Sequence, residues 1–132
     1  MSKQHPSNLE FLKREFKDII MEKIDSDMNG QLSTKTQQRA TFKLVDGSCL
    51  SITEILKNGV IDYFHYDWYL DKTRFIAKFH SEPHEAKEAR TSTEPFHIHI
   101  PDKHGLIKEK RLPNEKHRDL ISVLEFIRIR IA

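Results

Sequence analysis

Two neighbouring stretches, residues 60–70 and 74–80, constrain the fold most, because their side chains alternate between apolar and polar types. A period of two is typical of a β-strand that has one face against a core and the other face outward. With a tight turn at Asp71-Lys72, or a four-residue loop at 70–73, antiparallel pairing places apolar residues opposite one another. These pairs are Trp68 with Phe75, Tyr66 with Ala77, and Phe64 with Phe79. We therefore predict a hairpin with one apolar and one polar face.

The polar face of this hairpin carries the first candidate site residues. The same register places His65 opposite Lys78, and Tyr63 opposite His80. Trp68 and the apolar-face aromatics are expected in the core, whereas Tyr63 is the aromatic side chain that could meet a substrate. A single lysine is more often a solvated charge than a phosphate anchor, so the case for Lys78 as a phosphate contact depends on the residues beside it.

The first forty residues are interpreted as a helix followed by a linker. Ser7 and Glu10 form a capping-box pattern. Apolar residues then recur at intervals of three and four, at Leu9, Leu12, Phe16, Ile19, Ile20 and Ile24. This spacing predicts a helix over 7–29 that ends near Gly30. The polar segment 30–40 has no periodicity and is predicted to be a linker.

Further strands are predicted on both sides of the central hairpin. Asp46-Gly47 and Asn58-Gly59 are strong hairpin turn signals. The piece between these turns is either a strand or a short helix capped by Ser51 with Glu54. Residues 96–100 alternate cleanly, and the prolines at both ends favour an edge strand. A last strand is placed within 106–112.

The C-terminal segment predicts a helix. Its apolar stripe consists of Leu120, Val123, Leu124, Ile127 and Ile131, and Asn114 is the candidate cap. Its final residues also alternate as a strand would, which leaves the last turn open. The expected fold class is α+β: an antiparallel sheet of four to six strands with the C-terminal helix packed on one face and an N-terminal helix. Residues 1–132 form one domain, in which the sheet and C-terminal helix occupy 41–132.

Composition narrows the class of protein. At 132 residues the chain is the size of one domain, and it has no apolar run long enough to cross a membrane. The N-terminus has no secretory signal pattern, and the lone Cys49 fits a reducing compartment, so a cytoplasmic location is expected. Cys49 is expected to be a small buried side chain. A net charge of +2 permits contact with nucleic acid without arguing for it.

Histidine is the unusual residue type, with eight in the chain and seven of them after residue 64. His97 and His99 lie two apart on a predicted strand, so both belong to one face. Two imidazoles and a third ligand can hold zinc. They can also act as general acid and base on a phosphodiester, with a cation on the phosphate. On residue types alone, a surface strand without a site is equally open.

The order of these pieces resembles the TumE-like family of small toxins from bacterial toxin-antitoxin operons. The resemblance covers about residues 41–131, without the N-terminal helix and linker. It is carried by three motifs that contain Tyr63 and His65, then Lys78, Phe79, Pro83 and His84, then Pro95, His97 and His99. The chain departs from the family pattern where His80 replaces an Asp and where Glu85 and Phe96 replace histidines.

The resemblance implies a toxin neutralised by a cognate antitoxin, usually with a helix-turn-helix domain. Our working hypothesis is a metal-independent ribonuclease that acts on RNA without a cofactor. Its catalytic residues would be His97, His99 and His84, and its substrate-binding residues Lys78, Arg74, Tyr63, His65 and His80.

Two alternatives belong to different classes. One is a zinc-binding module in which His97 and His99 act with one of His65, His80 or His84. The other is a non-catalytic interaction protein that docks through Phe11, Phe16 and Ile20 of the first helix. A homodimer is a further partner that the sequence leaves open.

Overall fold

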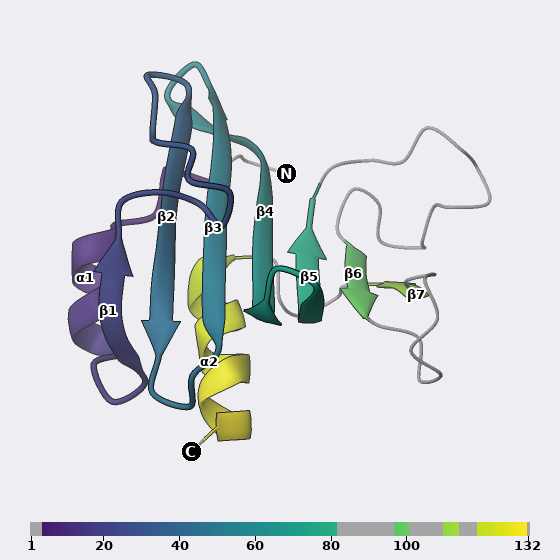
Figure 1. The fold of residues 1–132 in the computed structure, drawn as a ribbon. Coiled ribbons are helices and arrows are strands. Elements are labelled where there is room, and N and C mark those ends of the chain that lie inside the picture. Colours follow the sequence, from purple (N-terminus) through teal and green to yellow (C-terminus); the bar gives the residue numbers. More distant parts are fainter. Residues whose placement is uncertain (1–3, 82–96, 101–109, 114–118, 132) are drawn as a thin grey trace.

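The computed structural model describes residues 4–81, 97–100, 110–113 and 119–131, with only the backbone for 97–100 and 110–113 (Figure 1). The strands run antiparallel in chain order through one sheet, and a helix lies near each end of the chain. The elements are α1 (Leu9–Glu15), β1 (Ile20–Ile24), β2 (Gln37–Leu44), β3 (Cys49–Lys57), β4 (Val60–Asp71), β5 (Arg74–His80), β6 (His97–Ile100), β7 (Lys110–Pro113) and α2 (Leu120–Ile131). The predicted α+β class is confirmed. Strands β1 to β5 form the sheet described with its side chains, and β6 and β7 extend it.

Both helices lie on one face of the sheet, behind it in Figure 1. One hydrophobic cluster joins apolar side chains of α1 and α2 to alternate residues of β2 to β5, among them Phe42, Ile52 and Phe79. Arg128 of α2 fastens the two helical regions together, because Nη2 donates to the Glu15 carbonyl at 2.9 Å and to Asp18 Oδ1 at 2.7 Å. No helix among the described residues is long and apolar enough to cross a membrane. The apolar core lies between the sheet and the two helices, and the opposite face of the sheet is the polar face.

The predicted helix over 7–29 is wrong beyond its first two turns. The helix ends at Glu15, and Ile20 begins β1, which pairs with Leu44 of β2. Apolar residues spaced for a helix serve here first as a helix and then as a strand, because tertiary pairing overrides the local pattern. The predicted linker 30–40 is also too long, since β2 begins at Gln37. Phe16 and Ile20 are buried in the core, so they offer no docking surface.

The hairpin turns predicted at Asp46-Gly47 and Asn58-Gly59 are confirmed. Asn58 and Gly59 have φ of 56° and 78°, the left-handed pair that a two-residue hairpin needs. The piece between the turns is the strand β3. The C-terminal segment is helical to Ile131, and its first turn is capped by Asp119, whose Oδ1 accepts from Ser122 N at 2.8 Å. Asn114, the predicted cap, lies outside the described residues.

The β4–β5 hairpin keeps its predicted faces but changes its register. His65 is paired with His80, and Trp68 with Ala77, so these partners are displaced by two residues from the predicted ones. The displacement by two holds from His65 to Trp68, whereas Phe75 pairs with Tyr69 at an irregularity near the turn. The cause is the turn, which lies at Lys72-Thr73 and not at Asp71-Lys72. A displacement by two preserves the faces, because strand side chains alternate with a period of two.

Asp71 fixes this turn with its carboxylate. Oδ1 accepts from Thr73 N at 3.0 Å and from Thr73 Oγ1 at 2.9 Å, and Oδ2 accepts from Arg74 Nε at 2.7 Å. These contacts, the Arg74 hydrogen bond first, lower the pKa of Asp71 from 3.8 to about 2. The lowered pKa means that the carboxylate contributes stability above its unfolded pKa.

Asp71→Asn is expected to have a lower free energy of unfolding than the parent chain at neutral pH. This difference between the two chains should shrink at low pH. The parent's advantage is fully present above pH 3.8 and is lost as pH falls toward about 2, where its carboxyl becomes protonated. Urea unfolding from pH 6 down to pH 2 measures the difference. A gap between the two chains that stays constant across this range would contradict the role of the ionised carboxylate.

Candidate functional site

The candidate site lies on the polar face of β4 and β5, where strand alternation presents its residues. Tyr63, His65 and Asp67 of β4 alternate with the buried Phe64 and Tyr66, so the core anchors the backbone beneath them. All three are half-buried. A face held by a packed strand gives the site a rigid base.

The two histidines of these strands are stacked. The rings of His65 and His80 have centroids 4.2 Å apart with an interplanar angle of 19°. The Tyr63 ring lies 6.0 Å from His65 at 48°. The stack results from the corrected register, which makes His65 and His80 direct partners instead of the predicted pairs with Lys78 and Tyr63. Three rings therefore follow one another along this face.

Asp67 is a site residue that the sequence prediction missed. Its Oδ1 lies 2.8 Å from Nε2 of His80, and the side chains are only 20% and 15% exposed. A carboxylate accepts hydrogen bonds and cannot donate, so it fixes which ring nitrogen carries the proton. The signal in the sequence was its position two residues after His65, on the same strand face.

The two predicted phosphate contacts differ in their surroundings. The Lys78 ammonium lies 4.3 Å from the centroid of the Phe75 ring, close to the histidine stack along β5. Arg74 instead forms an ion pair with Asp71 at 2.7 Å, at the turn. In the strand register Lys78 pairs with Asp67, which contacts His80, whereas Arg74 pairs with Asp71 at the turn.

Strand β6 brings the remaining described histidine positions next to β5. In the backbone register, His97 is the partner of His80, and His99 is the partner of Lys78. The predicted edge position is wrong, because β7 pairs with the other side of β6 and is the predicted last strand. His84 lies outside the described residues.

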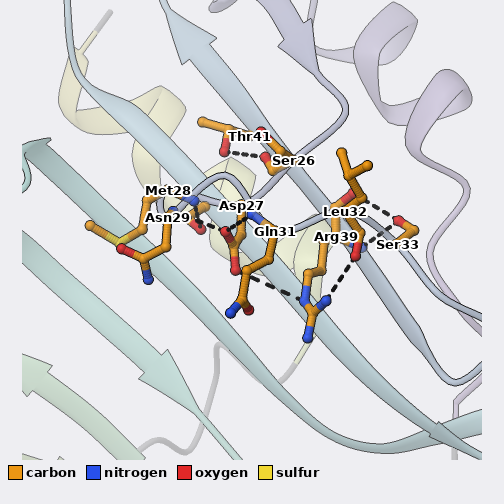
Figure 2. Close-up of polar contacts among 10 residues, drawn as sticks. Ser26, Asp27, Met28, Asn29, Gln31, Leu32, Ser33, Arg39 and Thr41 are labelled. Carbon is orange, nitrogen blue, oxygen red and sulfur yellow. Dashed lines mark hydrogen bonds and ion pairs between the residues drawn. The ribbon is translucent and has the colours of Figure 1, made fainter.

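A crossing segment, residues 25–36, covers the β2–β3 part of the polar face (Figures 1 and 2). The Ser26 carbonyl accepts from Thr41 Oγ1 at 2.7 Å, and Met28 N donates to Ser51 Oγ at 3.1 Å. Thr41 and Ser51 are consequently buried although they belong to the face opposite the core. The crossing segment thus separates the β2–β3 part of this face from the site on β4 and β5.

The crossing segment begins with the spacing of a calcium-binding loop, at Asp25, Asp27, Asn29 and Gly30, but Thr36 stands where that loop requires a Glu. Its contacts serve another purpose. Asp27 Oδ1 accepts from the backbone N–H of Asn29 and of Gln31, both at 2.9 Å, and Oδ2 faces the Arg39 guanidinium at 3.9 Å (Figure 2). Among the side chains that the structure describes, no three His, Cys, Asp or Glu residues are arranged to hold a metal ion. The loop is therefore held by its own amides and by an arginine.

Cys49 lies at the far end of the polar face, next to Tyr69. It is half-buried, where a fully buried side chain was expected, and it pairs across the ladder with Tyr69. Burial, and then the neighbouring Cys49, raise the pKa of Tyr69 to about 12. The phenol is therefore protonated at ordinary pH.

The fold and the polar face can now be compared with known proteins. Protein-family models match residues 8–131 to the family described as Toxin TumE. The chain belongs to the TumE toxin family. The predicted family is confirmed, and the match begins at residue 8, so it also includes α1, β1 and the crossing segment, which the resemblance over about 41–131 left out. Comparisons with characterised proteins and with solved structures give no match. Membership of a toxin family implies an antitoxin partner.

Proposed function

We propose that this TumE-family toxin is a metal-independent ribonuclease, with His97 and His99 as acid and base and His84 as a third participant. The observation that carries the proposal is the pairing of β6 with β5, which sets these two histidine positions opposite His80 and Lys78. Positions that pair directly in an antiparallel ladder share one face of the sheet. The proposed catalytic pair thus adjoins the stacked histidines of β4 and β5.

The proposed reaction needs only proton transfer and charge stabilisation. One histidine takes the proton of the attacking hydroxyl, and the other gives a proton to the leaving oxygen. Lys78 is the favoured cation for the phosphate, because it is the register partner of His99 and lies two residues from His80 on β5. The rings of Tyr63, His65 and His80 suit contact with unpaired bases.

A zinc-binding module is the second candidate, and the same pairing supports it. In this alternative His97 and His99 bind the metal with one of His65, His80 or His84, of which His80 is the register partner of His97. The alternative predicts stoichiometric zinc in protein purified without a histidine tag.

The deciding experiment incubates purified toxin and a fluorescently labelled RNA with and without EDTA. We expect cleavage at the same rate in both, because imidazole acid–base chemistry requires no metal. Elemental analysis of the same preparation checks the alternative. Cleavage that EDTA abolishes and zinc restores would reject the metal-independent mechanism, and intact RNA in every sample would reject the ribonuclease.

The partner expected for this toxin is a helix-turn-helix antitoxin, and its place of action is the cytoplasm. The antitoxin proposal follows from the family resemblance, and the cytoplasmic location rests on the lone Cys49, which fits a reducing compartment. The choice of RNA as target rests on the histidine cluster with Lys78 and on analogy with other small toxins. A homodimer stays a proposal as well. Size measurement of the toxin alone and with its antitoxin distinguishes these assemblies.

A further inference from the structure

Asp67 and His80 form a short polar contact on the polar face of β4 and β5. Asp67 Oδ1 and His80 Nε2 are 2.8 Å apart, and each side chain is at least four-fifths buried. The two residues come from neighbouring strands, β4 and β5, whose ladder continues on both sides of the contact. The pair is therefore fixed by the sheet and does not depend on a loop.

This contact determines the protonation pattern of the His80 ring. An ionised carboxylate only accepts hydrogen bonds, so Nε2 must carry a hydrogen whether the imidazole is neutral or protonated. In the neutral ring Nδ1 is then a hydrogen-bond acceptor. A second constraint comes from His65, whose ring stacks on His80 at 4.2 Å and limits rotation of the imidazole.

Asp67 is a described residue whose carboxylate contacts Nε2 of His80. Other charged or titratable groups near this ring belong to Lys78, His65 and His97. Lys78, the register partner of Asp67, places its ammonium 4.3 Å from the Phe75 ring centroid. His65 contributes a stacked ring, and His97 of β6 occupies the register position across from His80. Among the described residues, Asp67 supplies a carboxylate in contact with His80.

We propose that Asp67 is a positioning residue, which holds His80 so that Nδ1 is the nitrogen that hydrogen-bonds the RNA substrate. The inference rests on the proposed ribonuclease function and deepens it. His80 would then contact the substrate through one defined ring nitrogen, and the acid and base roles stay with His97 and His99. RNA offers both kinds of partner to Nδ1, a ribose hydroxyl as donor and a phosphate oxygen as acceptor.

The first test reads the tautomer of His80 by ¹⁵N NMR of the imidazole rings, with His80→Gln used to assign the signals. The parent toxin is expected to show a hydrogen on Nε2 and none on Nδ1 at high pH. Asp67→Asn should give a mixture of tautomers, because an amide can donate as well as accept. Asp67→Glu should restore the parent pattern. A neutral parent ring that carries its hydrogen on Nδ1 at high pH, or the same tautomer in Asp67→Asn as in the parent, would overturn the positioning role.

The second test measures the kinetics of RNA cleavage in the same variants. Asp67→Asn is expected to raise KM about 10-fold and to change kcat less, since it weakens an oriented hydrogen bond to substrate. Asp25→Asn is the matched control, because it also removes one carboxylate, at an 85% exposed side chain of the crossing segment. An unchanged KM would overturn the substrate contact. The expected tautomers in a toxin that cleaves no RNA would instead reject the proposed function.

Discussion

Glu54→Ala is expected to lower the free energy of unfolding by about 4 kcal/mol, the range for removing one partner of a buried charged network. Glu54 is fully buried on the core face of β3, between strands β2 and β4. Alanine would leave the donors around it without an acceptor and without water. Urea unfolding of the two chains measures the difference.

The size of this effect follows from four hydrogen bonds to one carboxylate. Oε1 accepts from Ser7 N at 3.0 Å and from Gln38 Nε2 at 2.8 Å, and Oε2 accepts from Ser7 Oγ and from the Tyr66 hydroxyl, both at 2.5 Å. Burial, and then the charge of Glu54, raise the pKa of Tyr66 well above its usual value. The phenol therefore stays a donor, and the network ties residue 7 to three strands.

Tyr66→Phe is the matched control for this prediction. It removes one donor and leaves Glu54 with three, so it should cost about 1 to 2 kcal/mol. In the double variant the two losses should not add, because the hydroxyl has no partner once the carboxylate is gone. Additive losses would show that Glu54 and Tyr66 do not act as a pair, and a Glu54→Ala chain as stable as the parent would show that the network contributes little.

The faces of the sheet could be predicted from the sequence, whereas the partners could not. A period of two assigns Phe64, Tyr66 and Trp68 to the core whatever the register. The partner of each residue depends on where the turn lies, and that is decided by the side chain of Asp71. The alternation pattern alone therefore could not predict that His65 stacks on His80.

Long-range contacts explain the other features that could not be predicted from the sequence. Glu54 has the strand position of an apolar residue, and its partners lie 12 to 47 residues away in the chain. Asp67 gains its role only when β5 brings His80 beside it. The end of α1 was missed for a related reason, since the pairing of β1 with β2 decides where the helix ends. Family membership, by contrast, was carried by local motifs and could be predicted.

The double variant His97→Ala/His99→Ala is expected to lower RNA cleavage at least about 100-fold, the usual contribution of acid–base catalysis, and to relieve growth arrest in cells that lack the antitoxin. The reason is that no proton acceptor or donor would remain at the two β6 positions opposite His80 and Lys78. His5→Ala is the matched control, because His5 is exposed and lies outside β4, β5 and β6.

The effect on catalysis must be separated from an effect on folding, since β6 is a short strand of the sheet. The double variant should unfold in urea within about 1 kcal/mol of the parent, because both positions share the face of His80 and Lys78, opposite the core. It should also still bind the antitoxin. Full cleavage and full growth arrest by a folded double variant would exclude His97 and His99 from the chemistry. Such a result would transfer the proposed acid and base roles to the pair formed by Asp67 and His80, whose contact on β4 and β5 does not involve β6.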